Sequence, residues 1–398
     1  MIREAPVICV LKIGGIGSVV TTLPLIAALK DTFPHSRVVY ITNPPNLPLI
    51  RRYKGIDQSF AIDPCPFPLS VSQGLSVIRE LRRIRPSIFL DLQIHTHRHT
   101  SAAIAHLSGS SVRLGFWRSS DWLRSRVFDE VIHANLLSPV HELYLQMARA
   151  LGCKVDDGLT RISLTIADQD RAHARGLLEG WCEPPTKLLI VNPNASEKAR
   201  VRRWPIEFYA AAVSRVLGAV ENLKVGLIGL AAEFDYVEEL RRRLADQSER
   251  VRNLAGESSL GSLLALLQRA DCLLTNDSGP LHLGLALETP TVGLFGPVHP
   301  DHYARLGDPA KKIIFYRPLL CSPCVHHVKT PSCGGKGYCM RFIAPEEVSE
   351  ACLYFLSPAG EISRSELQEW RFADYPRMVA QDRVPLGIWR RRILGWVD

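Results

Sequence analysis

The segment at residues 275–282 reads TNDSGPLH and stands between an apolar run and a helical pattern. Gly279 permits a tight turn, and Pro280 suits a first helical turn because its missing N–H costs nothing there. Free N–H groups at a helix start attract anions, and ligands of open parallel sheets bind at this carboxyl edge. The segment therefore predicts a diphosphate site in which Asp277 and His282 bond a sugar or a phosphate. The alternative is an ordinary helix start capped by Asp or Ser.

Four cysteines near the C-terminal end have the spacing Cys-x2-Cys-x8-Cys-x5-Cys: Cys321, Cys324, Cys333 and Cys339. Residues 334–337 read GGKG and supply a flexible hairpin between the last two. In a cytosolic protein such spacing favours a closed four-thiolate metal site over disulfides, and tetrahedral sulfur suits zinc or iron. The metal would be structural, because a closed shell leaves no position for catalysis. His326 and His327 are alternative ligands, and unpaired thiols in a loop are the alternative to a metal.

Strand-like and helical patterns alternate through both halves of the chain. The first half has apolar runs at residues 7–11, 37–42 and 88–92. The second half has them at residues 187–191, 224–229, 272–275 and 291–295. Alternating strands and helices imply parallel sheets with crossover helices. We therefore expect an α/β protein of two doubly wound, Rossmann-like lobes that face a cleft.

The domain boundaries are expected where the pattern changes. We predict an N-terminal, acceptor-side lobe at 1–167, a linker at 168–186, a C-terminal, donor-binding lobe at 187–357 with a Cys-rich hairpin at 321–339, and a tail at 358–398. Residues 389–396 of the tail read WRRRILGW. We expect the tail to be a terminal helix packed on the first lobe. The alternative is contact of its arginines and tryptophans with anionic lipid headgroups.

Composition excludes several classes of protein. The 398 residues suffice for two domains, and a hydrophobic share of 46% is typical of a globular rather than a disordered chain. No apolar run reaches the length of a membrane span, and the N-terminus lacks the features of a signal peptide, so we expect a cytoplasmic protein. The net charge of +8 suits acidic partners such as sugar nucleotides or anionic lipids. No nucleic-acid-binding motif stands out.

Several segments resemble one known family. Residues 275–297 closely resemble the donor-binding signature of bacterial heptosyltransferases, glycosyltransferase family 9. Residues 12–24 are similar to the family's first strand and glycine loop, and residues 91–93 to its DxQ segment. Residues 192–196, together with 202–205, resemble its second donor loop. The likeness covers nearly the whole chain and fades after Leu356.

The resemblance implies a GT-B enzyme that transfers a heptose from ADP-heptose, with inversion, to a cell-envelope glycan such as the lipopolysaccharide inner core. Donor contacts are implied for these positions: Gly15, Gly17, Ser18, Asn194, Ser196, Arg202, Asp277, Ser278, Gly279 and His282. Among them, Asn194, Ser196 and Arg202 would hold the diphosphate side of the donor. Arg202 stands where relatives often carry Lys, and its fork can donate two hydrogen bonds to a phosphate.

The chain departs from the family at the catalytic base. Family members carry an Asp directly after the glycine of the first loop, whereas Ser18 follows Gly17 here. Because serine is no base near neutral pH, either another carboxylate acts or the activity is altered. Asp91, at a strand end, is the first substitute, and its alternative role is to cap the next turn; Glu142 is the second. Helix N-termini and arginine can stabilise the leaving diphosphate, so no catalytic metal is required.

Three other functions stay open at this stage. A protein O-heptosyltransferase would have the same fold and donor, and a sugar-nucleotide epimerase would share the fold. A non-catalytic sugar-nucleotide-binding protein is a further interpretation, which Ser18 makes credible. The expected partners are a sugar-nucleotide donor and a glycan or lipopolysaccharide-type acceptor, with peripheral contact at the inner face of the cytoplasmic membrane and no nucleic acid.

Overall fold

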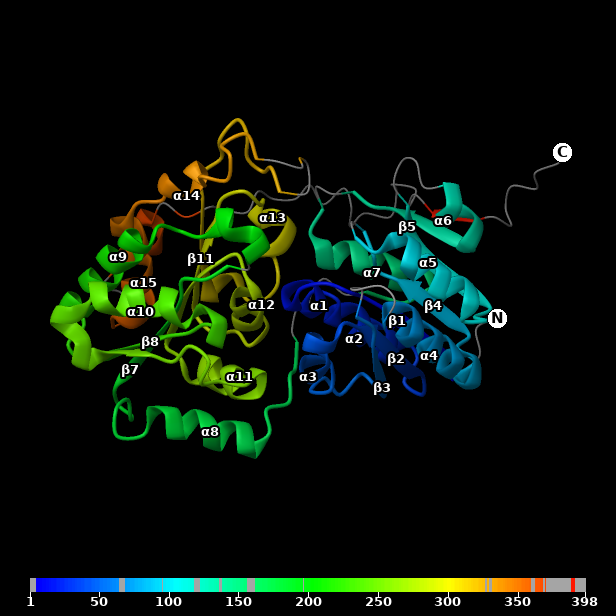
Figure 1. Ribbon diagram of the computed structural model, residues 1–398, viewed down its shortest axis with the longest axis horizontal. Helices are drawn as coiled ribbons and strands as arrows, with labels where there is room; N and C mark the ends of the chain where they lie inside the picture. Colours follow the sequence, from blue (N-terminus) through cyan, green and yellow to red (C-terminus); the bar gives the residue numbers. More distant parts are fainter. Residues whose placement is uncertain are drawn as a thin grey trace. The chain divides into compact units, whose positions relative to one another are not determined.

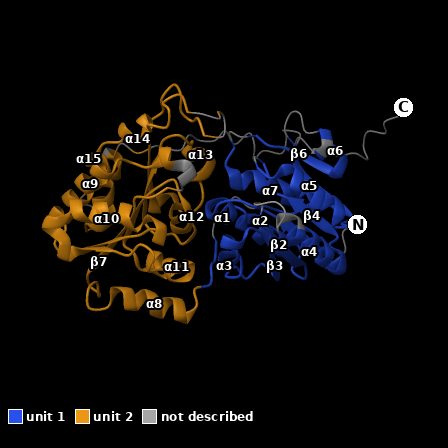
Figure 2. Ribbon diagram, in the orientation of Figure 1, with its two compact units in different colours: residues 1–165, 374–398 blue, residues 166–373 orange. Residues whose placement is uncertain are grey.

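The computed structural model divides the chain into two compact units (Figure 2). Unit 1 comprises residues 1–165 and 374–398, and unit 2 comprises residues 166–373. The structure describes residues 5–63, 69–94, 96–117, 122–135, 138–155, 162–195, 197–325, 328, 331–358, 362–367, 369 and 388–390.

Unit 1 is built on a seven-stranded sheet with the order β13-β6-β5-β4-β1-β2-β3 (Figure 1). Its strands are β1 (Val7–Leu11), β2 (Arg37–Thr42), β3 (Gln58–Ala61), β4 (Ile88–Asp91), β5 (Val112–Trp117), β6 (Glu130–His133) and β13 (Ile388–Arg390). Its helices are α1 (Ile16–Val20), α2 (Leu23–Thr32), η1 (Pro44–Asn46), α3 (Leu47–Ile50), α4 (Leu69–Ile84), α5 (Arg98–Leu107), α6 (Trp122–Val127) and α7 (Val140–Ala150). All pairings are parallel except that of β13 with β6.

Unit 2 is built on a six-stranded parallel sheet with the order β12-β11-β10-β7-β8-β9 (Figure 1). Its strands are β7 (Lys187–Asn192), β8 (Leu223–Leu227), β9 (Val251–Asn253), β10 (Cys272–Asn276), β11 (Thr291–Phe295) and β12 (Lys312–Tyr316). Its longer helices are α8 (Asp168–Leu178), α9 (Ile206–Ala219), α10 (Phe234–Arg243), α11 (Leu260–Arg269), α12 (Gly279–Ala286) and α15 (Pro345–Leu356). Its short helices are η2 (Glu197–Arg202), η3 (Ala231–Glu233), η4 (Ala245–Arg250), α13 (Pro300–Tyr303), η5 (Pro309–Lys311), α14 (Tyr338–Arg341) and η6 (Arg364–Glu366).

The central strands consist of buried apolar residues because helices cover both faces of each sheet. In β1 the residues from Ile8 to Leu11 have no exposed surface, and the same holds for all of β10. The covering helices have one buried face, as in α11, where Ser259 caps the first turn by accepting a hydrogen bond from the N–H of Ser262. No helix among the described residues is long and apolar enough to cross a bilayer.

Both sheets share one topology, so the predicted doubly wound α/β fold is confirmed. In unit 1 the strand order is 3-2-1-4-5-6, extended by β13, and in unit 2 the corresponding order is 9-8-7-10-11-12. The order reverses between β1 and β4 in one unit and between β7 and β10 in the other. Ligands of doubly wound sheets bind beyond the carboxyl ends of the strands at such a switch point. The fold therefore directs attention to the segments that follow these four strands.

The expected linker and tail differ in detail from the observed structure. The linker at 168–186 contains α8, which belongs to unit 2, and Arg171 of α8 donates a hydrogen bond to Gln268 of α11. Of the tail, Ile388–Arg390 forms a strand beside β6, with Trp389 opposite Val131. Residues 391–396, the remainder of the arginine-rich motif, lie outside the described residues.

Asp91, at the end of β4, forms a buried ion pair. Its Oδ2 lies 2.8 Å from Arg124 Nη1 of α6, and neither side chain has exposed surface. The same oxygen accepts a hydrogen bond from Ser101 Oγ at 2.6 Å, while Oδ1 accepts one from the backbone N–H of Gln93 at 3.0 Å. A carboxylate with three donors and no access to solvent is a structural group. Asp91 as the general base therefore has no support in the structure, because an acceptor hydroxyl cannot reach it.

We expect Asp91→Asn to destabilise unit 1 by about 3–5 kcal/mol, because it leaves the Arg124 charge buried without its partner. Thermal and urea unfolding of the full chain measure the change. Glu239→Gln is the matched control, since Glu239 pairs with Arg243 on the surface of α10, where an ion pair contributes at most about 1 kcal/mol. Equal stability of Asp91→Asn and wild type would contradict this structural role.

Candidate functional site

Two asparagine side chains fix the loops at the switch point of unit 2. Asn192 ends β7, and its Nδ2 donates to Ser278 Oγ at 2.8 Å. Asn276 ends β10, and its Nδ2 donates to the carbonyl oxygen of Pro193 at 2.9 Å while its Oδ1 accepts from the N–H of Trp204 at 3.0 Å. Each amide thus ties its own strand end to the loop after the neighbouring strand. These bonds hold the ends of β7 and β10 in one arrangement.

The N-terminus of α12 lies directly after β10. Ser278 is the N-cap residue and has an extended backbone, but its side chain does not cap the helix because it is held by Asn192. Gly279 and Pro280 form the start of the first turn. The N–H groups of that turn have no acceptor within the helix, so they can bind an anion at the carboxyl edge of the sheet.

Three side chains gather around Asp277, which is 3% exposed. Its Oδ2 lies 3.0 Å from Arg202 Nη1, and its Oδ1 lies 3.7 Å from His282 Nε2. The ring of Tyr303, from α13, stands edge-on to the His282 ring at a centroid distance of 6.4 Å. Burial raises the pKa of Tyr303 to about 12; Asp277 adds to the rise and Arg202 opposes it. We call Arg202, Asp277, His282 and Tyr303 the Asp277 cluster.

Three buried polar atoms in and beside the Asp277 cluster have no hydrogen-bond partner among the described residues. They are Nε of Arg202, Nδ1 of His282 and Oδ1 of Asn194. Asn194 belongs to the same region, because Asn276 Nδ2 contacts its carbonyl oxygen at 3.3 Å. Buried polar groups in proteins are normally hydrogen-bonded. Polar atoms that lack such partners and lie in one region therefore indicate that a polar ligand binds there.

The structure brings most of the predicted donor residues of unit 2 together. Asn194, Arg202, Asp277, Ser278, Gly279 and His282 all lie on the segments that follow β7 and β10, with Arg202 in η2 and with Gly279 and His282 in α12. Ser196 lies outside the described residues. Sequence reasoning missed Tyr303 and the locking role of Asn192 and Asn276. The asparagines could have been found as polar residues that end two apolar strands, whereas nothing in the local sequence marks Tyr303.

The neighbouring arginine of the pair at 202–203 has a different role. Arg203 Nη2 donates to the carbonyl oxygen of Ala195 at 3.0 Å, and its guanidinium lies 4.5 Å from the centroid of the Tyr236 ring. These contacts hold the loop after β7. Arg202, in contrast, directs its charge to Asp277.

The segment at residues 321–339, here called the Cys segment, packs against the same region of unit 2. Ser322 Oγ donates to the carbonyl oxygen of Gly296. The N–H of Cys324 donates to the carbonyl oxygen of Pro297 at 3.0 Å. A Cβ atom on Gly296 would lie 2.8 Å from Cys339 Sγ, and one on Gly337 would lie 3.1 Å from the carbonyl oxygen of Val201. The Cys segment thus contacts both the segment after β11 and η2, which carries Arg202.

The four thiols of the Cys segment differ in environment. Cys324 and Cys339 are buried, Cys333 is half-buried and Cys321 is exposed. Burial raises the pKa of Cys339 to about 11, and the other three cysteines add to the rise. For Cys333 burial acts in the same direction, but hydrogen bonds from the backbone N–H groups of residues 335–338 outweigh it and lower the pKa. Within the described ranges, no three His, Cys, Asp or Glu side chains are grouped closely enough to hold a metal ion. His326 and His327 lie outside those ranges.

The glycine loop of unit 1 follows β1 and is held by side chains from neighbouring segments. The N–H of Gly14 donates to Asn43 Oδ1 at 3.1 Å, and the N–H of residue 13 donates to Gln93 Oε1 at 3.2 Å. Gly15 is the N-cap of α1, which contains Gly17. Ser18 Oγ donates to the carbonyl oxygen of Gly15 at 2.8 Å. The predicted residues Gly15, Gly17 and Ser18 thus lie together at the switch point of unit 1, and their contact with a donor stays a prediction.

Two ionisable residues of unit 1 are Lys12, which precedes the glycine loop, and Glu142 on α7. Lys12 Nζ donates to the carbonyl oxygen of Leu92 at 3.0 Å and lies 5.1 Å from the centroid of the Tyr144 ring. Glu142, in the first turn of α7, accepts a hydrogen bond from Arg149 Nη1 at 3.2 Å and is 30% exposed. Glu142 therefore keeps the access to solvent that Asp91 lacks. Sequence reasoning did not single out Lys12, although it directly precedes the glycine loop.

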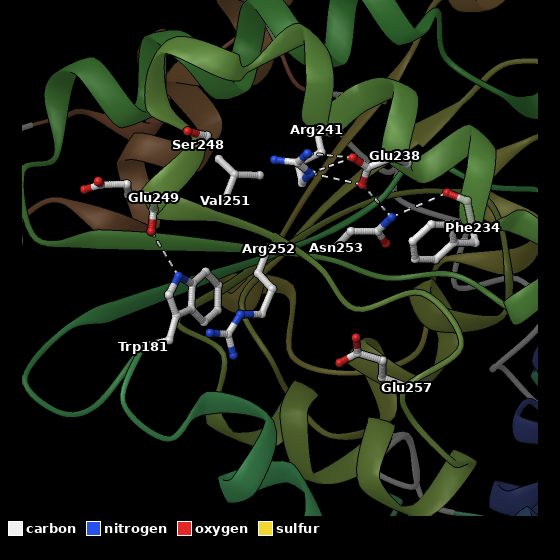
Figure 3. Close-up of a pocket in the computed structure, with 10 residues that line it drawn as sticks. All are labelled: Trp181, Phe234, Glu238, Arg241, Ser248, Glu249, Val251, Arg252, Asn253 and Glu257. Carbon is white, nitrogen blue, oxygen red and sulfur yellow. Dashed lines mark hydrogen bonds and ion pairs between the residues drawn. The ribbon is translucent and has the colours of Figure 1, made fainter.

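A separate hollow of about 650 Å³ lies along β9, one of the two edge strands of the sheet in unit 2 (Figure 3). Trp181 and Arg252 form one side, with the guanidinium 4.7 Å from the indole ring, and Phe234 and Glu238 stand across from them. None of the site residues predicted from the sequence lines it. Two of its charged groups, Glu238 and Arg241, form an ion pair at 2.7 Å.

Comparison with known proteins identifies relatives of the chain. Residues 75–333 match the family model described as glycosyltransferase family 9 (heptosyltransferase). A lipooligosaccharide heptosyltransferase 2 from Campylobacter jejuni is 28% identical over 166 residues, which are 41% of this chain and 49% of the relative. The chain thus spans about half the length of that relative. The lipopolysaccharide heptosyltransferase 2 of Escherichia coli is 23% identical over 319 residues, or 75% of this chain and 85% of the relative.

Solved structures share the fold. The structure of E. coli ADP-heptose lipopolysaccharide heptosyltransferase II has a TM-score of 0.71 at 20% identity and covers 88% of this chain and 98% of its own. The iron-containing dodecameric glycosyltransferase TibC from enterotoxigenic E. coli has a TM-score of 0.53 at 14% identity and covers 89% of this chain and 77% of its own. At these identities the likeness establishes the architecture, which is that of the expected GT-B fold.

Proposed function

The chain belongs to glycosyltransferase family 9, and on that premise we propose that it transfers a heptose from ADP-heptose to a cell-envelope glycan, with inversion. The observation that carries the proposal is a set of buried polar atoms beside the N-terminus of α12 that have no hydrogen-bond partner among the described residues. Diphosphate oxygens would accept hydrogen bonds from Arg202 and from the first-turn N–H groups. Sugar hydroxyls can both donate and accept, so they suit the leftover atoms of Asn194 and His282.

The Asp277 cluster accounts for stabilisation of the leaving group. As the bond between the anomeric carbon and the diphosphate breaks, negative charge grows on the diphosphate oxygens. The Arg202 guanidinium, fixed at 3.0 Å from Asp277, and the N-terminus of α12 would oppose that charge without reorganising. Asp277 holds Arg202 and His282 in place. It engages Nη1 of Arg202 and would leave the other N–H groups of the guanidinium to donate to phosphate. These groups act without a catalytic metal.

The proposed acceptor is an inner-core glycan of the lipopolysaccharide type. Support comes from relatives whose names specify lipopolysaccharide or lipooligosaccharide heptosyltransferase activity. We propose that unit 1 supplies the acceptor-side residues and unit 2 the donor site. Because such an acceptor is anchored by its lipid and the donor is water-soluble, we infer that the protein works at the cytoplasmic face of the membrane, as a peripheral enzyme.

We further propose that the four thiols Cys321, Cys324, Cys333 and Cys339, which are not grouped closely enough for a metal among the described residues, come together around a structural zinc or iron ion when it binds. Four sulfur donors suit either ion, and the backbone N–H groups around Cys333 favour its thiolate form. A metal would cross-link the segment and so support its contacts with Gly296 and Val201. Its role is to hold the fold beside the donor site, and the transfer itself does not use it.

Replacement of Arg202 tests the donor site. We expect Arg202→Ala to raise the Kd for ADP-heptose about 10- to 150-fold, because a charge-assisted hydrogen bond contributes about 1.5–3 kcal/mol. Loss of Arg202 would also leave Asp277 to repel the diphosphate. Isothermal titration measures the Kd, and release of ADP in the presence of deacylated core glycans measures turnover.

Arg243→Ala is the matched control for that experiment, because Arg243 is a surface residue of unit 2 paired with Glu239. It should leave the Kd and turnover unchanged. Unaltered donor affinity in Arg202→Ala would contradict the assignment of the site. Tight donor binding by wild type, without release of ADP for any acceptor, would favour the non-catalytic interpretation.

The metal content of the purified protein tests the role of the Cys segment. We expect about one zinc or iron ion per chain by elemental analysis, and loss of that ion in the double variant Cys324→Ser, Cys333→Ser. Cys153→Ser, in unit 1, should keep the ion. Wild type that contains no metal after growth with both zinc and iron would refute the metal site.

A further inference from the structure

The transfer needs a base, and the carboxylates near the switch point of unit 1 do not supply an obvious one. Ser18 carries no carboxylate, and Asp91 is buried and bonded to Arg124, Ser101 and the backbone of Gln93. Glu142 is paired with the guanidinium of Arg149, whose Nη1 lies 3.2 Å from its Oε2. A different group at this edge must therefore be considered.

Lys12 has the geometry of such a group. It follows the last residue of β1, is 8% exposed and stands at the start of the glycine loop. Its Nζ has one hydrogen-bond acceptor among the described residues, the carbonyl oxygen of Leu92 at 3.0 Å. Among those described residues, no carboxylate forms an ion pair with Lys12. An ammonium group has three donors, so most of its hydrogen-bonding capacity is unused by the residues that the structure describes.

We propose that Lys12, as a neutral amine, is the general base that takes the proton of the acceptor hydroxyl. The proposal rests on the function proposed above. In the step, the acceptor oxygen forms a bond to the anomeric carbon of the heptose while the bond from that carbon to the diphosphate breaks. The leaving ADP keeps the electron pair of the broken bond, and the hydroxyl proton passes to Lys12 Nζ.

The surroundings of Lys12 fit both of its protonation states. The neutral amine can donate to Leu92 O and still offer its lone pair. The lysinium that forms is stabilised by the same carbonyl oxygen and by the face of the Tyr144 ring, 5.1 Å from Nζ. Since the ring and the carbonyl belong to α7 and to the segment after β4, the amine is held from two sides.

The charges around Lys12 set the pH range in which it would act. Burial lowers the pKa of Lys12 to about 8, and the negative charge of Asp91 opposes that fall. Arg124 neutralises Asp91 in part. On α7 the titratable groups nearest in sequence to Tyr144 are His141 and Glu142, which lie 3.7 Å from each other. A carboxylate at position 18 would add a negative charge to this loop and favour the ammonium form, whereas Ser18 does not.

The pH dependence of kcat/KM distinguishes an amine base from a carboxylate base. Because Lys12 acts only when it has lost its proton, kcat/KM should rise about tenfold per pH unit below pH 8 and level off above it. A carboxylate base would already be ionised above about pH 6, so the profile would be flat from there upward. Release of ADP from ADP-heptose, with a saturating acceptor glycan, is the assay.

Three variants complete the experiment. Lys12→Arg keeps the positive charge but cannot lose a proton at these pH values, and Lys12→Met keeps the length of the side chain without charge. Both should lose at least 100-fold in kcat while the Kd for ADP-heptose stays within twofold of wild type. Glu142→Gln should keep the wild-type profile. Ser18→Asp should move the rising limb to lower pH, because it introduces a carboxylate that can act as the base.

The outcomes separate this proposal from the proposed function. Turnover by wild type with a flat profile between pH 6.5 and 9 would overturn the role of Lys12 alone. Folded Lys12→Met with turnover within tenfold of wild type would do the same. Absence of turnover by wild type at every pH, despite donor binding, would overturn the proposed transferase activity and the role of Lys12 with it.

Discussion

The ion pair between Arg202 and Asp277 is the interaction on which the proposed donor site depends. It joins η2, which follows β7, to the residue between β10 and α12, at a distance of 3.0 Å and with Asp277 almost fully buried. A lone buried carboxylate beside a diphosphate site would repel its ligand, and a lone arginine would lack a fixed direction. Paired, they present one oriented cation next to a helix N-terminus. The asparagines that end β7 and β10 hold the two segments close enough for this pair to form.

The two units apply one topology to different chemistry. Each sheet reverses its strand order at its centre, and each places its polar residues after the two strands that flank the reversal. In unit 2 these residues combine a cation with free backbone N–H groups, which suits an anionic leaving group. In unit 1 they comprise a buried lysine, a glycine loop and a fully paired aspartate. The division matches a reaction with an anionic donor and an uncharged hydroxyl nucleophile.

Much of this arrangement could be predicted from the sequence, and the remainder depends on contacts between distant residues. The glycine–proline helix start and the strand-end asparagines are local signals, so the region of the proposed donor site could be predicted from the sequence. The burial of Asp91 could not be predicted, because its partner Arg124 comes from α6, the third element after β4, and the local sequence does not pair the two residues. Tyr303 joins the Asp277 cluster only through the fold. The cysteine spacing indicated a set of ligands but not that the Cys segment packs on Gly296 and Val201.

Amide hydrogen exchange of the full chain with and without ADP-heptose tests the central claim most directly, because it locates the donor without assuming any acceptor. We predict that the donor slows exchange in the loop after β7, residues 192–195, and at the N-cap and first turn of α12, residues 278–282, whose N–H groups would bind the diphosphate. The hollow along β9, with Trp181 and Arg252, should exchange at an unchanged rate. If the donor slowed exchange at β9 and left exchange at α12 unchanged, the donor would not bind where we propose.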